Sequence, residues 1–233
     1  MEHLPILIYI VFSITVLLAI RLFYQAANKA KSFLKIVLPW LLFQTIVSSS
    51  GFYQNTNTYP PRFALLLLPP LIMIIRLFLS SRGRLFLDKL DIRVLTILHV
   101  IRIPVELVLF WLFNNQVIPG VMTFEGRNFD IFSGLTAPVI YYFGFVRKNL
   151  NKRVILLWNF ICLALLMNIA FHAIFSLPTG FQQFGFGQPN IAILYFPFVL
   201  LPACLVPLVL LSHLASIRQL ILNKERDYYN RIV

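Results

Sequence analysis

The sequence predicts an all-α fold, a polytopic transmembrane helical bundle with about seven spanning helices. The composition supports this fold, because 59% of the 233 residues are hydrophobic and only 12% are charged. Soluble domains carry roughly 25% charged residues. The mean hydropathy of +0.82 points the same way, and the apolar residues gather in separate runs, most of them close to the roughly 20 residues that cross a bilayer.

The apolar runs define the predicted helices in order. They cover residues 4–24, 33–52, 63–79, 92–113, 131–146, 154–175 and 191–217. The residues between these runs are too few for a soluble catalytic, nucleotide-binding or nucleic-acid-binding domain. We therefore expect one transmembrane domain over 1–217 and a basic cytoplasmic tail over 218–233.

The first run differs from a secretory signal peptide in its flanking charges. Glu2 precedes it and Arg21 lies near its end, whereas a signal peptide has a positive leader before its apolar stretch. The run is therefore expected to remain as a spanning helix.

The net charge of +12 reflects orientation once the basic residues are sorted by position. The even-numbered connections contain only Arg62 and Arg127, while the odd-numbered connections and the tail contain most of the others. Because cytoplasmic loops are enriched in Lys and Arg, the amino terminus is predicted outside and the carboxyl tail inside, in the cytoplasmic (plasma) membrane. No nucleic-acid partner is needed to explain the charge. The basic residues on the cytoplasmic side are Arg21, Lys29, Lys31, Lys35, Arg76, Arg82, Arg84, Lys89, Arg93, Arg147, Lys148, Lys152, Arg153, Arg218, Lys224, Arg226 and Arg231.

Two basic segments alternate charged and apolar residues, and both predict short interfacial helices. They are residues 80–91 and 216–233. Such helices contact anionic lipid at the cytoplasmic face; the alternative is that these charges only fix orientation. In the last apolar run, Pro197, Pro202 and Pro207 predict a bent helix, because proline lacks the backbone donor of a regular helix.

The fourth helix contains His99, Arg102 and Glu106 at offsets that place all three on one face. A charge near the centre of a bilayer costs roughly 2.5–3.5 kcal/mol on insertion scales. Arg102 and Glu106 are four residues apart, so an intrahelical ion pair is expected. The sequence therefore predicts a polar site centred on these two residues, with Glu106 as a titrating carboxylate.

Other polar residues are predicted to complete an outward-opening funnel around this site. Counting residues from the cytoplasmic ends places Asn168 level with Glu106 and His172 near the outer mouth, with Gln44 near the middle of the second helix. Glu125, Arg127 and Asp130 in the loop over 114–130 are expected at the rim. Such a funnel would bind or transport a small polar solute or ion.

Several alternatives remain open. A non-catalytic membrane subunit or assembly protein would use Arg102 and Glu106 as a structural ion pair. A membrane-embedded enzyme would need a nucleophile, such as one of the serines at 48–50, beside His172, but the zinc-binding HExxH string and the nucleophile elbow are both absent. Haem ligation by His99 and His213 is a further alternative; otherwise no cofactor is predicted. Cys162 and Cys204 lie inside apolar runs, and their spacing suggests neither a disulfide nor a metal site.

Overall fold

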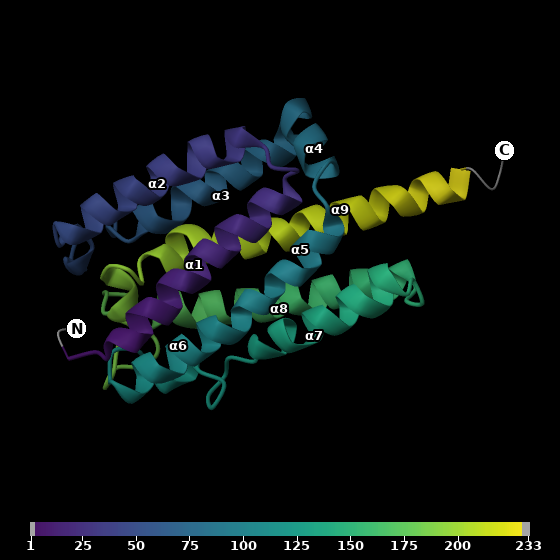
Figure 1. Cartoon of the computed structure of the whole chain (residues 1–233). Helices are drawn as coiled ribbons and strands as arrows, with labels where there is room; N and C mark the ends of the chain where they lie inside the picture. Colours follow the sequence, from purple (N-terminus) through teal and green to yellow (C-terminus); the bar gives the residue numbers. More distant parts are fainter. Residues whose placement is uncertain (1–2, 230–233) are drawn as a thin grey trace.

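The computed structural model describes residues 3–229, with side chains for residues 3–222, and within that range it consists of helices without strands (Figure 1). Each of the seven predicted apolar runs contains helix, which confirms the all-α prediction. The α-helices are α1 (Ile6–Ala26), α2 (Lys31–Ser49), α3 (Ala64–Leu79), α4 (Ser81–Asp88), α5 (Ile92–Leu98), α6 (Arg102–Asn114), α7 (Ile131–Tyr141), α8 (Lys152–Phe175) and α9 (Val206–Tyr229). The shorter elements are 3₁₀ turns at η1 (Phe52–Gln54), η2 (His99–Ile101), η3 (Gly120–Met122) and η5 (Ala192–Leu194), and π turns at η4 (Tyr142–Val146) and η6 (Leu201–Leu205).

Several of these helices are long and apolar enough to cross a membrane. Within the described residues five qualify by length and composition, and α3 with α4 makes a sixth if this pair, bent by 92°, is one span. The segment Ile131–Val146 is a shorter apolar helix. The qualifying segments are Ile6–Ala26, Lys31–Ser49, Ile92–Asn114, Lys152–Phe175 and Leu201–Leu222.

The last helix differs from its predicted bounds of 191–217. Its span begins at Leu201, and residues 191–200 form mainly a 3₁₀ turn and irregular chain. Pro197 and Pro202 lack backbone donors and disfavour helix in the residues before them, so the prolines delay the helix rather than only bending it. The predicted tail from 218 is helical over the described residues, because α9 continues to Tyr229. Residues 230–233 lie outside the described residues.

The fourth predicted helix is interrupted at its polar residues. The 3₁₀ turn His99–Ile101 separates α5 from α6. Pro104 cannot donate to the carbonyl of Val100, and the chain tightens instead, so that the Arg102 N–H bonds the His99 carbonyl three residues earlier.

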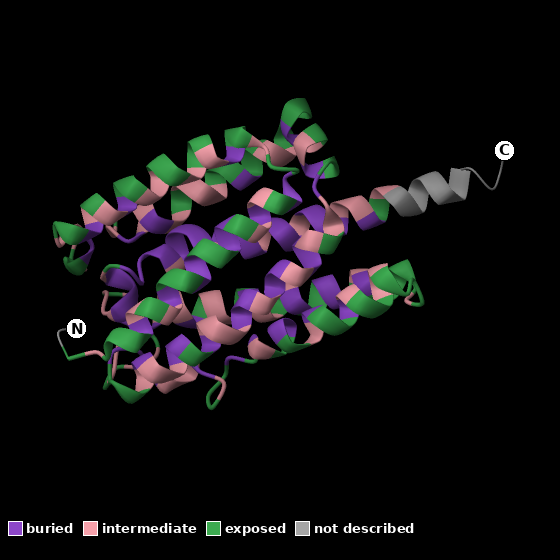
Figure 2. Cartoon of the chain, viewed as in Figure 1, coloured by how far each residue is buried: buried purple, intermediate pink, exposed green. Residues whose placement is uncertain are grey.

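The helices pack around α9, which contacts α5 and α8, while α1 and α7 each contact both α5 and α6. Figure 2 shows burial concentrated in these central helices and exposure along α2, whose buried residues are Phe33, Gln44 and Ser48. Cys162 and Cys204 are both buried and free.

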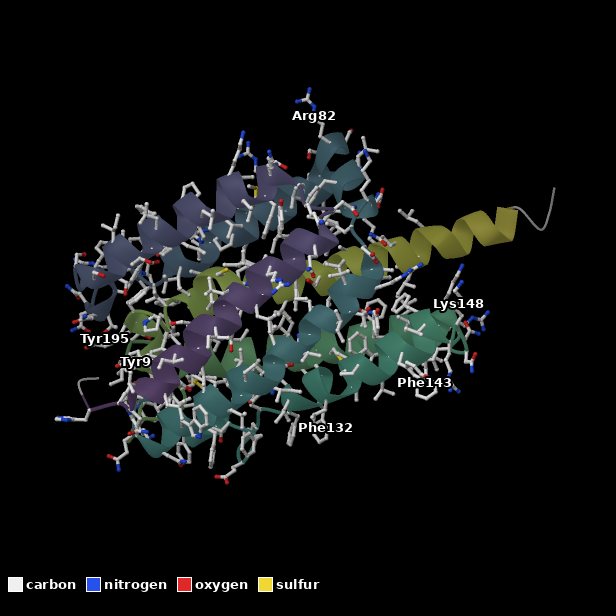
Figure 3. All side chains as sticks on the ribbon, viewed as in Figure 1. Tyr9, Arg82, Phe132, Phe143, Lys148 and Tyr195 are labelled. Atoms are coloured by element: carbon white, nitrogen blue, oxygen red, sulfur yellow. The ribbon has the colours of Figure 1, made fainter. Side chains whose placement is uncertain are left out.

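The basic connections share one end of the bundle. Arg82 on α4 and Lys148 in the α7–α8 connection lie toward the end where α9 leaves the bundle (Figure 3), and the start of α1 lies at the other. The start of α1 and the end of α9 therefore lie at opposite ends of the bundle.

Candidate intramembrane polar site

Arg102 is the centre of a buried polar cluster, with only 3% of its surface exposed. Its Nη1 forms an ion pair with Asp130, just before α7, and also donates to the Cys162 carbonyl on α8 at 3.3 Å. Its Nη2 lies 3.0 Å from Nε2 of His213 on α9. Arg102 on α6 therefore contacts α8, α9 and the residue just before α7. The expected ion pair between Arg102 and Glu106 is wrong for the described chain, because Arg102 pairs with Asp130 instead.

Two histidines extend the cluster toward the basic end. His213 uses its other nitrogen, Nδ1, to contact Oδ1 of Asn159 at 2.9 Å. His99 stacks on His213 with ring centroids 3.9 Å apart and an interplanar angle of 12°, and Trp158 packs against both rings. All three of His99, Asn159 and His213 are buried. The ring nitrogens of His99 and Nε of Arg102 have no hydrogen-bond partner among the described residues.

The histidine pair does not fit a haem iron held between its two rings. Axial ligation requires a ring nitrogen of each histidine to point at the iron. Here the rings stack face to face, and both nitrogens of His213 already contact Arg102 and Asn159.

Glu106 lies one turn from Arg102 and has a different partner. The side-chain amide of Asn128 donates to both carboxylate oxygens, at 2.6 and 2.7 Å, and also contacts the Met122 carbonyl. The Asn128 Oδ1 accepts the Asp130 N–H at 3.0 Å. One short turn of the α6–α7 connection therefore supplies the partners of both charged residues on α6.

The α6–α7 connection reaches deep into the bundle. Phe132, near the start of α7, lies partway along the bundle (Figure 3), and Asn128 and Asp130 are buried. Non-helical chain at membrane depth is tolerated where protein surrounds it, and it often forms ligand sites in transporters. Asp130, predicted at the outer rim, is instead part of the buried cluster.

A cavity of about 80 Å³ has Glu106 and Asp130 among its lining residues. The other residues that line it are apolar, so Glu106 and Asp130 are the ionisable residues of its lining. A water molecule needs roughly 10–15 Å³ by this measure, and the cavity therefore has room for a few water-sized groups. Its apolar lining is Phe63, Leu66, Leu67, Val105, Leu109, Met122, Leu166, Ile169, Ala170, Ala173, Ile174, Leu177, Ile193, Leu201, Pro202 and Val206.

The remaining predicted site residues lie apart from the cluster. Asn168 donates to the Arg127 carbonyl at 2.7 Å, and His172 contacts the Asn168 carbonyl and packs on Phe184. Gln44 is buried on α2, where it accepts a hydrogen bond from the hydroxyl of Tyr53. The side chains of Glu125 and Arg127 are exposed. Ser48 and His172, considered together for catalysis, make no hydrogen bond to each other in the described chain.

Sequence reasoning missed Asn128 and Asn159. Asn159 lies at the depth of His99 and His213 when residues are counted from the basic end, so depth matching at that end contained the signal. Asn128 gave no such signal, because it lies in a connection whose return into the bundle depends on tertiary packing.

Comparison with known proteins adds no further assignment. No family model, curated protein or solved structure matches this chain. Its function is therefore inferred from the chemistry of the site.

Proposed function

We propose that this chain is a multi-pass protein of the cytoplasmic membrane that binds or transports a small polar solute or ion at Glu106. The observation that carries the proposal is the environment of this carboxyl group. Glu106 is 1% exposed, borders the cavity, and has the neutral amide of Asn128 as its hydrogen-bond partner.

A count of charges favours uptake of a cation or a proton. Arg102 and Asp130 neutralise each other in their ion pair. An ionised Glu106 would add one negative charge that no ion pair within the described chain neutralises. Burying such a charge is costly, so a proton or a small cation in the cavity would stabilise the site.

We also propose that the solute reaches the cavity from the outer surface. The cavity is lined by Leu177 and Ile193, from the chain between α8 and α9, and by Met122. These residues belong to connections at the end opposite the basic loops. With basic loops in the cytoplasm, the cavity is nearer the outer surface, and the solute would enter from outside.

The test compares Glu106→Gln with Glu125→Gln, which removes an exposed carboxylate from the α6–α7 connection. The melting temperature of the purified chain is measured with a panel of monovalent cations, amines and polar metabolites at several pH values. We expect a ligand-dependent and pH-dependent rise for the wild type and Glu125→Gln. Glu106→Gln is expected to fold and to lose this response, because Gln keeps the shape of the side chain without its charge.

A second candidate is a non-catalytic membrane subunit in which the cluster only holds helices together. The contacts of Arg102 with Asp130, the Cys162 carbonyl and His213 favour it. This alternative predicts no ligand response in the wild type and an unchanged melting temperature for Glu106→Gln, because Glu106 is not a partner of Arg102. That pair of results would replace the transport proposal.

A further inference from the structure

A second, larger hollow lies between α2 and α3, away from the polar cluster. Its volume is about 860 Å³, near the upper end of the roughly 300–1,000 Å³ range for ligand sites. Side chains of α2 and α3 form its walls, and residues of η6 and α9 such as Ala203 and Leu208 lie opposite them. We call it the α2–α3 groove.

The groove is open because α2 is weakly attached to the bundle. Two contacts help to attach it. The Trp40 indole N–H donates to the Ala203 carbonyl at 2.9 Å, and the Phe33 ring packs on the Phe23 ring with centroids 4.9 Å apart. In a bilayer, lipid chains can cover an apolar surface that protein leaves uncovered. The groove therefore suits an occupant with an apolar chain.

Two arginines lie at the basic end of the α2–α3 groove. Arg76 is in the last turn of α3, and Arg82 is in the first turn of α4. Of the described residues that line the groove none is acidic. Arg76 and Arg82 are exposed, and their guanidinium groups have no hydrogen bond or ion pair to the described chain. The guanidinium of neighbouring Arg84 instead donates to the carbonyls of Phe78 and Leu79.

The bend between α3 and α4 fixes this pair of arginines at the end of the groove. The two helices meet at 92°, and Gly83 permits the contact, because a Cβ there would lie 2.3 Å from the Leu77 carbonyl oxygen. Pro69 lies seven residues before Arg76 on α3, about 10 Å deeper at 1.5 Å per residue. The groove thus has a charged end at the depth of lipid headgroups and an apolar length below it.

We infer that the α2–α3 groove binds one anionic glycerophospholipid of the cytoplasmic leaflet, its phosphate on Arg76 and Arg82 and an acyl chain beside Trp40 and Met73. Guanidinium groups bind phosphate oxygens through paired hydrogen bonds. The positive charges of the two arginines favour an anionic headgroup, and the apolar walls of the groove favour contact with an acyl chain. This inference is independent of any ligand at Glu106.

The experiment is native mass spectrometry of the full chain in detergent, with phosphatidylglycerol or phosphatidylcholine added. We expect one phosphatidylglycerol to be retained in preference to phosphatidylcholine. Arg76→Gln with Arg82→Gln should weaken its retention about thirtyfold, the expected effect of two basic residues near an anionic headgroup. Lys148→Gln with Arg153→Gln removes the same charge from the α7–α8 connection and the first turn of α8, and it should leave retention unchanged.

A groove-filling variant tests the apolar part separately. Met73 lines the groove, so Met73→Trp should reduce retention while both arginines remain. Equal loss in the two charge variants, equal retention of both lipids, or full retention by Met73→Trp would each overturn the inference. A lipid-free dimer that forms in the wild type and is lost in Met73→Trp would assign the groove to a second copy of the chain instead.

Discussion

Arg102 and Glu106 lie four residues apart on the same helix, are buried to a similar extent, and have contrasting surroundings. Protein atoms from α8, α9 and the start of α7 surround Arg102, including the countercharge of Asp130. Glu106 has one neutral partner, Asn128, and a cavity beside it. The difference separates two uses of a buried charge. The charge of Arg102 is matched within the protein and joins helices, whereas under the proposed function a ligand matches the charge of Glu106.

The largest expected effect comes from removing the countercharge of Arg102. Asp130→Asn keeps the side-chain size but leaves the guanidinium uncompensated, so the free energy of unfolding should fall by about 3–5 kcal/mol. Chemical denaturation in detergent measures this. Glu125→Gln is the control and should change little, because Glu125 is exposed.

The double variant Arg102→Met with Asp130→Asn sharpens the same comparison. Removing both charges leaves neither member of this ion pair unmatched, so the double variant should be more stable than Asp130→Asn alone. If Asp130→Asn is as stable as Glu125→Gln, or if the double variant is the least stable of the three, Arg102 is not the structural charge.

The next effect tests the close packing of α7 beside Arg102. A Cβ on Gly134 would lie 2.8 Å from Cγ1 of Ile103 and 3.3 Å from Cβ of Arg102. Gly134→Ala should therefore push α7 from α6 and destabilise the fold by about 1–3 kcal/mol. Gly180→Ala is the matched control, because no atom lies within 4 Å of a Cβ there. Equal melting temperatures for the two variants would show that the contact is easily relieved.

The surroundings of Arg102 and Glu106 also show which features the sequence could predict and which it could not. The apolar runs predicted both ends of six of the seven helices to within about three residues. This was possible because the length of an apolar run can be read from the sequence alone. The spacing of His99, Arg102 and Glu106 also shows from the sequence alone that they share one helical face. All three are buried, as that face predicts. The partner of Arg102 was not local. Asp130 follows a polar connection, and only packing reveals that this connection returns into the bundle.

The smallest expected effect concerns a neutral polar contact outside the cluster. The hydroxyl of Tyr53, in the α2–α3 connection, donates to Oε1 of Gln44 at 2.5 Å, and both side chains are fully buried. Tyr53→Phe removes the donor and should lower the free energy of unfolding by about 0.5–1.5 kcal/mol. Tyr59→Phe changes a 99% exposed tyrosine in the same connection and should have no effect.

The pH dependence of the Tyr53 contact gives a second measurement. Burial raises the pKa of Tyr53 from 10 to about 12, although the hydrogen bond to Gln44 opposes the shift. The unfolded chain therefore loses this proton at lower pH than the folded chain does. The stability that Tyr53 contributes is complete below pH 10 and should fall as the pH rises toward 12. The difference in melting temperature between the wild type and Tyr53→Phe should shrink over this range, while the difference between the wild type and Tyr59→Phe stays near zero. A constant difference for Tyr53→Phe from pH 8 to 12 would mean that the hydroxyl titrates alike in both states and that Gln44 is not held by a buried, protonated donor.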